Sequence, residues 1–109
     1  MVSLNSFVVL GALMFCIGLF GALSKRNAVA ILMSIEIMLN AVNVTLVGFS
    51  AAFAHHAPPA TGGRLTGQVF AVFIITVAAA EASVALAMII AIYRRRNTID
   101  VGEINLMRW

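Results

Sequence analysis

The sequence predicts an all-α integral membrane protein that crosses the bilayer with three transmembrane helices and forms a single transmembrane domain over residues 1–109. Of its 109 residues, 62% are hydrophobic and only 10% are charged, and the mean hydropathy is +1.05. A water-soluble domain of this size would need a far more polar surface, because small proteins expose most of their residues. Three apolar stretches account for most of the chain, and each is long enough to cross a hydrocarbon core.

The first apolar stretch predicts a helix over about residues 4–23, roughly the 20 residues that one membrane crossing needs. Gly11, Gly18 and Ala22 lie on one side of this helix, and such small residues let a neighbouring helix approach closely. No charged side chain precedes Lys25, whereas a signal peptide begins with a basic segment. We therefore expect this helix to be retained rather than cleaved.

The second and third stretches predict helices over about residues 28–54 and 67–93. A basic turn, Ser24–Asn27, separates the first two helices. The segment from His55 to Arg64 contains both prolines and two glycines, which predicts a loop. Arg94–Arg96 follows the third stretch, and a short polar tail continues from there.

Basic residues predict the orientation of the chain in the membrane. Lys25, Arg26 and Arg94–Arg96 fall on one side of a three-helix arrangement, and Arg64 falls on the other. Loops rich in lysine and arginine stay in the cytoplasm. We therefore expect a cytoplasmic C-terminus and an N-terminus on the outside.

The remaining polar residues argue against several other classes of protein. The net charge of +3 comes from residues that flank apolar stretches, without the basic, aromatic-rich stripe of a nucleic-acid binder. Cys16 is the only cysteine, so no intrachain disulfide or cysteine metal site is expected. His55 and His56 stand without further ligands and are expected to be solvated. No dinucleotide or phosphate-binding motif is present.

Two glutamates stand out inside the apolar stretches, Glu36 and Glu81. A carboxylate at the centre of a membrane helix costs at least about 2.5–3.5 kcal/mol, so it usually faces a bundle interior or a wet cavity and has a function. Glu36 lies roughly 12 Å from the basic end of its helix, and Glu81 roughly 18 Å from the basic end of its own, at 1.5 Å per residue. Both carboxyls are therefore expected near the middle of the bilayer.

The neighbours of the glutamates favour proton handling. Glu36, Asn40 and Asn43 follow the spacing of one helical face, where the asparagines can bond across helices or hold water. Alanines surround Glu81 and leave room for a partner helix. This chain has no basic residue at a similar depth. A proton relay is therefore favoured over the alternative in which each glutamate pairs with a basic residue of a neighbouring subunit and only holds an assembly together.

Other polar residues in the predicted helices are expected to form ordinary hydrogen bonds between helices. They are Thr45, Ser50 and Thr76.

Two long segments, Phe15–Asn43 and Thr66–Arg96, resemble subunit K of the proton-pumping NADH-quinone oxidoreductase, the small three-helix subunit of complex I. The counterpart in chloroplasts and cyanobacteria is called subunit 4L. The resemblance maps the two membrane glutamates of the family onto Glu36 and Glu81. It maps the basic turn of the family onto Lys25 and Arg26, which with Asn40 and Asn43 form the supporting polar residues.

The resemblance implies a subunit with no cofactor and no redox centre of its own. NADH or ferredoxin, FMN, the iron–sulfur clusters and quinone would bind to other subunits. This subunit would lie in lipid between the small subunits at the quinone end and an antiporter-like subunit, and would relay protons along a central hydrated axis. The membrane would be the bacterial inner (plasma) membrane or, alternatively, a thylakoid.

Two other functions remain open from the sequence. The related small subunit of multisubunit sodium/proton antiporters resembles the second helix but generally lacks the glutamate of the third, so Glu81 argues against it. The other is a purely structural assembly subunit.

Overall fold

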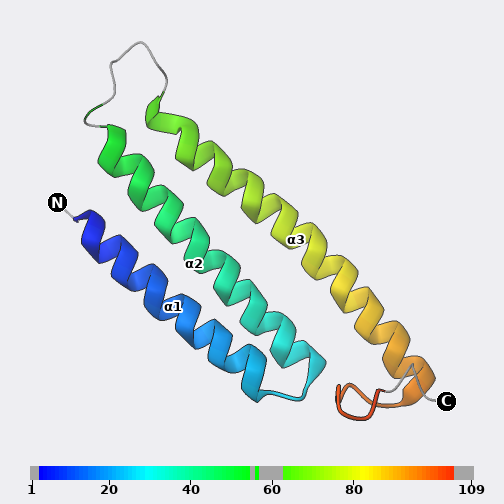
Figure 1. Ribbon diagram of the computed structural model, residues 1–109. Coiled ribbons are helices and arrows are strands. Elements are labelled where there is room, and N and C mark those ends of the chain that lie inside the picture. The colour runs from blue at the N-terminus through cyan, green and yellow to red at the C-terminus, as the bar shows by residue number, and fades with distance from the viewer. Residues whose placement is uncertain (1–2, 55, 57–62, 105–109) are drawn as a thin grey trace.

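The structure is a layer of three long antiparallel helices with α2 in the middle (Figure 1). It is a computed structural model that describes residues 3–54, 56 and 63–104, with side chains for all of these except 63–65. The helices are α1 (Leu4–Ser24), α2 (Ala28–Ala54) and α3 (Gly63–Arg96). All three are long and apolar enough to cross a membrane. The predicted all-α architecture with three such helices is therefore confirmed.

The predicted helix bounds agree closely with the structure except at α3. The prediction placed this helix over residues 67–93, with a loop that reached residue 64, but the helix begins at Gly63 and ends at Arg96. Hydropathy marks only the part of a helix that can lie in hydrocarbon, whereas the hydrogen-bonded backbone can continue beyond it. Arginine is also a good helix former, so Arg94, Arg95 and Arg96 extend the helix rather than end it.

Glycines let α1 and α2 pack at close range. Gly11 lies against Thr45 and the carbonyl oxygen of Ala41, and Gly18 lies against Met38 and the carbonyl oxygen of Ser34. A Cβ atom added to Gly18 would lie only 2.8 Å from that Ser34 oxygen. The predicted small-residue face of α1 therefore exists, but α2 of the same chain occupies it.

A second seam of small residues joins α2 to α3. Gly67 lies against the side chain of Ser50, and a Cβ atom there would be 3.0 Å from the carbonyl oxygen of Leu46. Ala71 and Ala78 are buried, and Leu39 of α2 shares a recess with residues of α3. We call these residues the α2–α3 contact line: Leu39, Leu46 and Ser50 on α2, and Gly67, Ala71 and Ala78 on α3.

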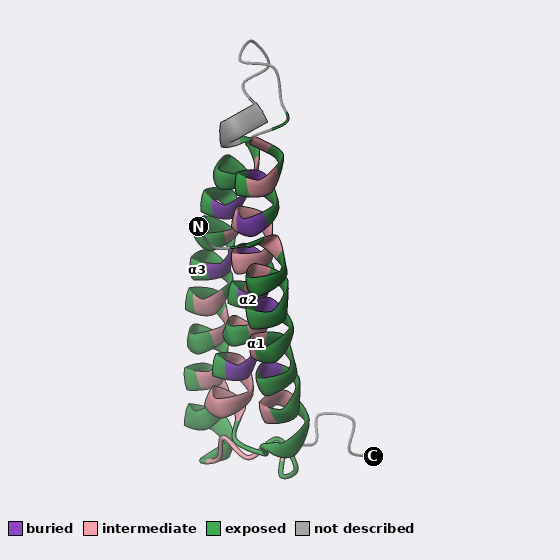
Figure 2. Cartoon of the chain, turned by 90° about the vertical axis from the view of Figure 1, so that its left-hand side faces the viewer, coloured by how far each residue is buried: buried purple, intermediate pink, exposed green. Residues whose placement is uncertain are grey.

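Burial is confined to the strips where helices meet (Figure 2). Elsewhere the surface is apolar and open: Phe20 is 72% exposed and Leu23 is 80% exposed. A soluble monomer rarely exposes such a large contiguous apolar surface. This surface is suited to lipid and to neighbouring membrane subunits.

The segment after α3 folds back onto the turn between α1 and α2. Asn97 ends α3 with a positive φ of 55°, a left-handed conformation that asparagine tolerates at helix ends. The backbone N–H of Ala28 then donates to the carbonyl oxygen of Ile99 at 2.9 Å, and that of Val101 donates to the oxygen of Arg26 at 2.9 Å. The sequence suggested a simple polar tail here. In the structure residues 97–101 form a strap across the end of the helix layer.

The hydroxyl groups of Thr45 and Thr76 bond within their own helices. Thr45 donates to the carbonyl oxygen of Ala41, and Thr76 donates to that of Val72, each at 2.9 Å. The prediction that these two residues bond between helices is therefore wrong. A threonine in a helix can satisfy its hydroxyl four residues back without any partner helix.

Candidate functional site

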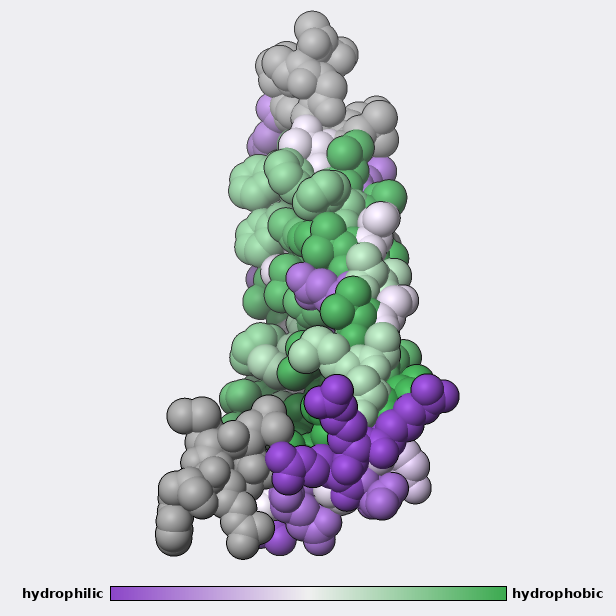
Figure 3. All heavy atoms as spheres, turned by 90° about the vertical axis from the view of Figure 1, so that its right-hand side faces the viewer, coloured by the Kyte–Doolittle hydropathy of each residue, from purple (hydrophilic) through white to green (hydrophobic). Residues whose placement is uncertain are grey.

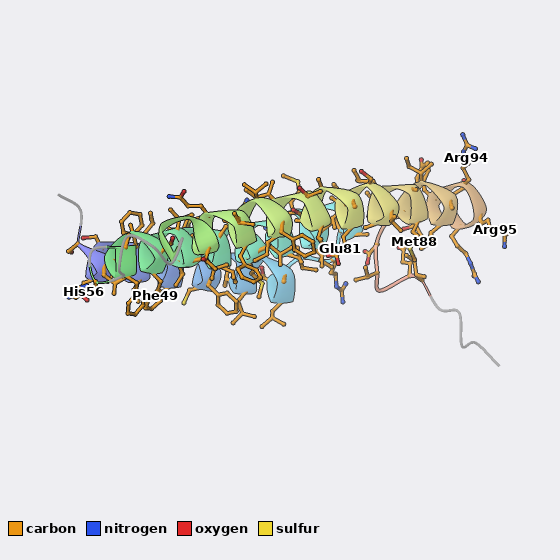
Figure 4. The ribbon with its side chains drawn as sticks, turned by 90° about the horizontal axis from the view of Figure 1, so that it is seen from above. Phe49, His56, Glu81, Met88, Arg94 and Arg95 are labelled. Carbon is orange, nitrogen blue, oxygen red and sulfur yellow. The ribbon has the colours of Figure 1, made fainter. Side chains whose placement is uncertain are left out.

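The two intramembrane glutamates lie at the same height in the helix layer. Gly67 of α3 packs against Ser50 of α2. From this contact, α3 runs 14 residues forward to Glu81 (81 − 67), and α2 runs 14 residues back to Glu36 (50 − 36). Because the helices are antiparallel and rise equally per residue, both steps cover the same distance. Glu81 lies near mid-length of the layer in Figure 4. It is level with Glu36 rather than slightly further from the basic end, as counting residues from the predicted helix ends suggested, because α3 continues to Arg96.

The same helical geometry places the two glutamates on opposite flanks of the layer. Successive residues turn by about 100°, which puts each glutamate roughly 50° away from the α2–α3 contact line on its own helix. Because the two helices run in opposite directions, these rotations lead to opposite sides of the contact. Glu36 therefore faces one flank of the α2–α3 pair and Glu81 faces the other.

The chain alone does not bury either carboxyl. Glu36 is half-buried and Glu81 is exposed. Among the side chains that the structure describes, neither glutamate has an ion-pair or hydrogen-bond partner. Glu81 lines a shallow recess of about 170 Å³ formed by Leu39, Phe73, Ile74, Val77 and Ala78. The shielded surroundings that the sequence predicted must therefore come from neighbouring subunits.

The face of α3 shown in Figure 3 carries one small hydrophilic patch at mid-height, surrounded by apolar side chains. Glu81 is the only charged residue of α3 between Thr66 and Tyr93. An isolated polar spot on such a surface is costly in lipid. It is therefore a point where another protein or water must meet the chain.

The two asparagines of α2 lie in different surroundings. Asn40 is exposed, on the flank that Glu36 faces. Asn43 is only 8% exposed, because three further residues turn it by about 60° toward α3. Its Oδ1 atom is buried and has no hydrogen-bond partner among the residues that the structure describes. Seven residues place Asn43 only about 20° around the helix from Glu36, so the three residues share one face, and Asn43 lies at the edge of that face that packs against α3.

The supporting basic residues gather at one end of the layer, the lower end in Figure 3. Lys25 and Arg26 are exposed there, and the strap brings the end of α3 beside them. Figure 4 shows Arg94 and Arg95 at the same end. Arg26 precedes α2, and the eight residues from the start of that helix at Ala28 to Glu36 cover about 12 Å along the helix axis. These side chains therefore do not touch the glutamates.

The structure offers no support for a metal site in the part of the chain that it describes. No group of three or more histidine, cysteine, aspartate or glutamate side chains there could hold a metal ion. His56, labelled in Figure 4, is exposed, while His55 lies outside the described residues. Cys16 is a free, exposed thiol.

Comparison with known proteins decides the family. A family model described as NADH-ubiquinone/plastoquinone oxidoreductase chain 4L matches residues 6–109. The chain belongs to this family. It is 55% identical over 108 residues to NADH-quinone oxidoreductase subunit K of Desulfitobacterium hafniense. The aligned residues cover 99% of this chain and 96% of that protein. It is 50% identical over 109 residues to NAD(P)H-quinone oxidoreductase subunit 4L of a Synechococcus species, over the full length of both chains.

Membership in the subunit K/4L family confirms the resemblance seen in the sequence. The protein is a membrane subunit of a multisubunit NADH-quinone oxidoreductase, complex I. The geometry fits such a subunit, because its apolar faces and its unpaired glutamates are left open for neighbours. The exposure of Glu81 could not be read from the sequence, where the alanines around it suggested a close partner helix.

Proposed function

We propose that this subunit K carries protons sideways through the membrane arm of complex I, with Glu36 and Glu81 as successive carriers. The single observation that supports this most strongly is their arrangement at one height on opposite flanks of the α2–α3 pair. A proton handed to one carboxyl from a subunit on one flank can leave from the other carboxyl to a subunit on the opposite flank. A merely structural pair of acids has no need for matched heights.

The surroundings of the glutamates suit proton exchange. Among the described side chains, no cation of this chain lies against either carboxyl, so both remain open to water and to neighbouring subunits. At this height Ala78 of α3 is buried beside Glu81, and it shares a recess with Leu39 of α2. Small side chains leave space in which water can complete a path between the flanks.

The two flanks define the proposed partners. One would meet the small subunits at the quinone end, and the other would meet an antiporter-like subunit, with lipid on the remaining apolar surface. NADH or ferredoxin, FMN, iron–sulfur clusters and quinone would all lie in other subunits. This chain would contribute proton transfer and no redox chemistry.

We also propose that the basic end of the layer is cytoplasmic. Lys25, Arg26 and Arg94–Arg96 are at the same end, where the strap joins the turn to the tail, and such a cluster marks the cytoplasmic side. The N-terminus of α1 would then lie outside. The membrane would be the bacterial plasma membrane, with a thylakoid as the alternative.

The first test compares two carboxamide variants in membranes that contain equal amounts of assembled complex. Glu36→Gln keeps shape and hydrogen bonding but removes the exchangeable proton, so coupled quinone reduction should fall sharply. Glu81→Gln should be milder, because its recess is open and water can substitute more readily. Thr76→Val is the matched control, since that hydroxyl bonds only its own helix. Normal activity in Glu36→Gln would leave the glutamates only a structural role. Failed assembly of both glutamine variants would indicate that the glutamates hold helices of neighbouring subunits together.

A further inference from the structure

Asn43 carries the one buried side-chain oxygen or nitrogen without a partner that is found in the described part of the chain. Its side chain is only 8% exposed, on the surface of α2 that faces α3. A buried acceptor without a donor costs about 1–3 kcal/mol in a protein interior and more in hydrocarbon. The buried hydroxyl of Ser34, by contrast, avoids this cost by donating to the carbonyl oxygen of Ala30 at 2.8 Å.

The group that satisfies Asn43 must be small. Oδ1 is enclosed by this chain itself, so a side chain from a neighbouring subunit would have to enter between two packed helices. Ala71 and Ala78 are the buried residues of α3 along the contact line, and they offer no polar hydrogen atoms. A water molecule is small, donates to an orphan acceptor and is the usual solution for buried polar groups.

Asn43 and Glu81 lean toward each other along the layer. Asn43 is seven residues beyond Glu36 (43 − 36), so its Cα lies about 10 Å along the axis from the common height of the glutamates. Side chains in a helix point back toward its N-terminus. Because α2 and α3 are antiparallel, the amide of Asn43 leans toward the glutamates and the carboxyl of Glu81 leans toward Asn43.

We propose that Asn43 binds a water molecule between α2 and α3, and that this water positions the hydrogen-bonded chain through which Glu81 exchanges its proton. The second half of this statement rests on the proposed relay, whereas the water site itself does not. Asn43 is thus a positioning residue that acts through water. Asn40, which lies exposed on the other side, has a different environment and is not part of this site.

The direct test is a high-resolution cryo-EM map of the assembled complex. We expect density for an ordered water at about 2.7–3.2 Å from Oδ1 of Asn43, and its loss in Asn43→Leu, which has a similar size but no acceptor. A dry interface, or a protein donor bonded to Oδ1, would overturn the site. Because the wild-type map alone decides this point, the test holds even if the leucine variant fails to assemble.

The functional test uses the same complexes. Asn43→Leu should lower coupled proton pumping about five- to tenfold with both glutamates intact, because an apolar group cannot replace a bridging water. Asn43→Ser keeps an acceptor and space for water and should restore most of the pumping. Leu46→Met changes a neighbour on the same contact line at nearly constant volume and should pump normally. Full pumping by assembled Asn43→Leu would overturn the positioning role. The proposed relay is tested separately: full pumping by Glu36→Gln would show that the relay itself is wrong.

Discussion

Gly67 of α3 packs directly against Ser50 of α2, and this contact sets the register of the two helices. Counted from it, Glu36 and Glu81 come to the same height. A shift of one helical turn between α2 and α3 would separate the carboxyls by about 5 Å along the axis. The close approach at one end of the layer is therefore what aligns the site in the middle.

Adding a methyl group at this contact should weaken the subunit. In Gly67→Ala the new Cβ would meet the side chain of Ser50 and lie 3.0 Å from the backbone oxygen of Leu46, which cannot move aside alone. We expect a loss of about 1–3 kcal/mol, typical of overpacking, seen as less assembled complex in membranes and a lower melting temperature.

Gly21→Ala is the control for this change. Its Cβ would meet only the side chain of Ser34 and no backbone atom. The Ser34 hydroxyl can rotate at the cost of its bond to Ala30, so the effect should be smaller. Equal amounts of complex, of equal stability, in wild type and Gly67→Ala would show that the contact does not hold the register.

The end of α3 depends on a left-handed residue. Asn97 has a φ of 55°, and a β-branched residue adopts this conformation at a cost of about 1–2 kcal/mol. Asn97→Val should therefore loosen the strap, and the amide hydrogens of Ala28 and Val101 should exchange faster with deuterated solvent in the complex. Asn97→Gly, which accepts positive φ freely, should protect them like wild type. Equal protection in the valine variant would mean that Asn97 does not anchor the strap.

The charge distribution predicts the topology. Lys25, Arg26 and the three arginines that end α3 lie at one end of the layer, so a reporter fused after Trp109 should be cytoplasmic. A reporter inserted in the connection between α2 and α3, after residue 58, should be external. An external C-terminal reporter would refute the proposed orientation.

The sequence was sufficient to predict the three helices, because these follow from apolar length. It also located the close-packing glycines of α1. It could not show that α2 covers those glycines, since small residues suit a partner from the same chain or another equally well. The flank that each glutamate faces depends on the contact line, which only the three-dimensional packing defines.

Two other features were beyond the reach of sequence patterns. The strap is held by backbone hydrogen bonds of Ala28 and Val101, which leave no mark on residue types. Asn43 shares the spacing of Glu36 and Asn40, yet a turn of about 60° moves it into the interface with α3. Periodicity alone groups these residues, and the position of the neighbouring helix separates them.

A double-mutant cycle tests whether Glu36 and Glu81 act in series on one proton path. The measurement is the initial rate of proton uptake by proteoliposomes that contain equal amounts of wild-type, Glu36→Gln, Glu81→Gln or doubly substituted complex. Two steps on one path are not additive, so the double variant should pump no more slowly than Glu36→Gln alone. A double variant slowed by the product of the two single effects, or a Glu36→Gln complex that pumps at the wild-type rate, would contradict the relay.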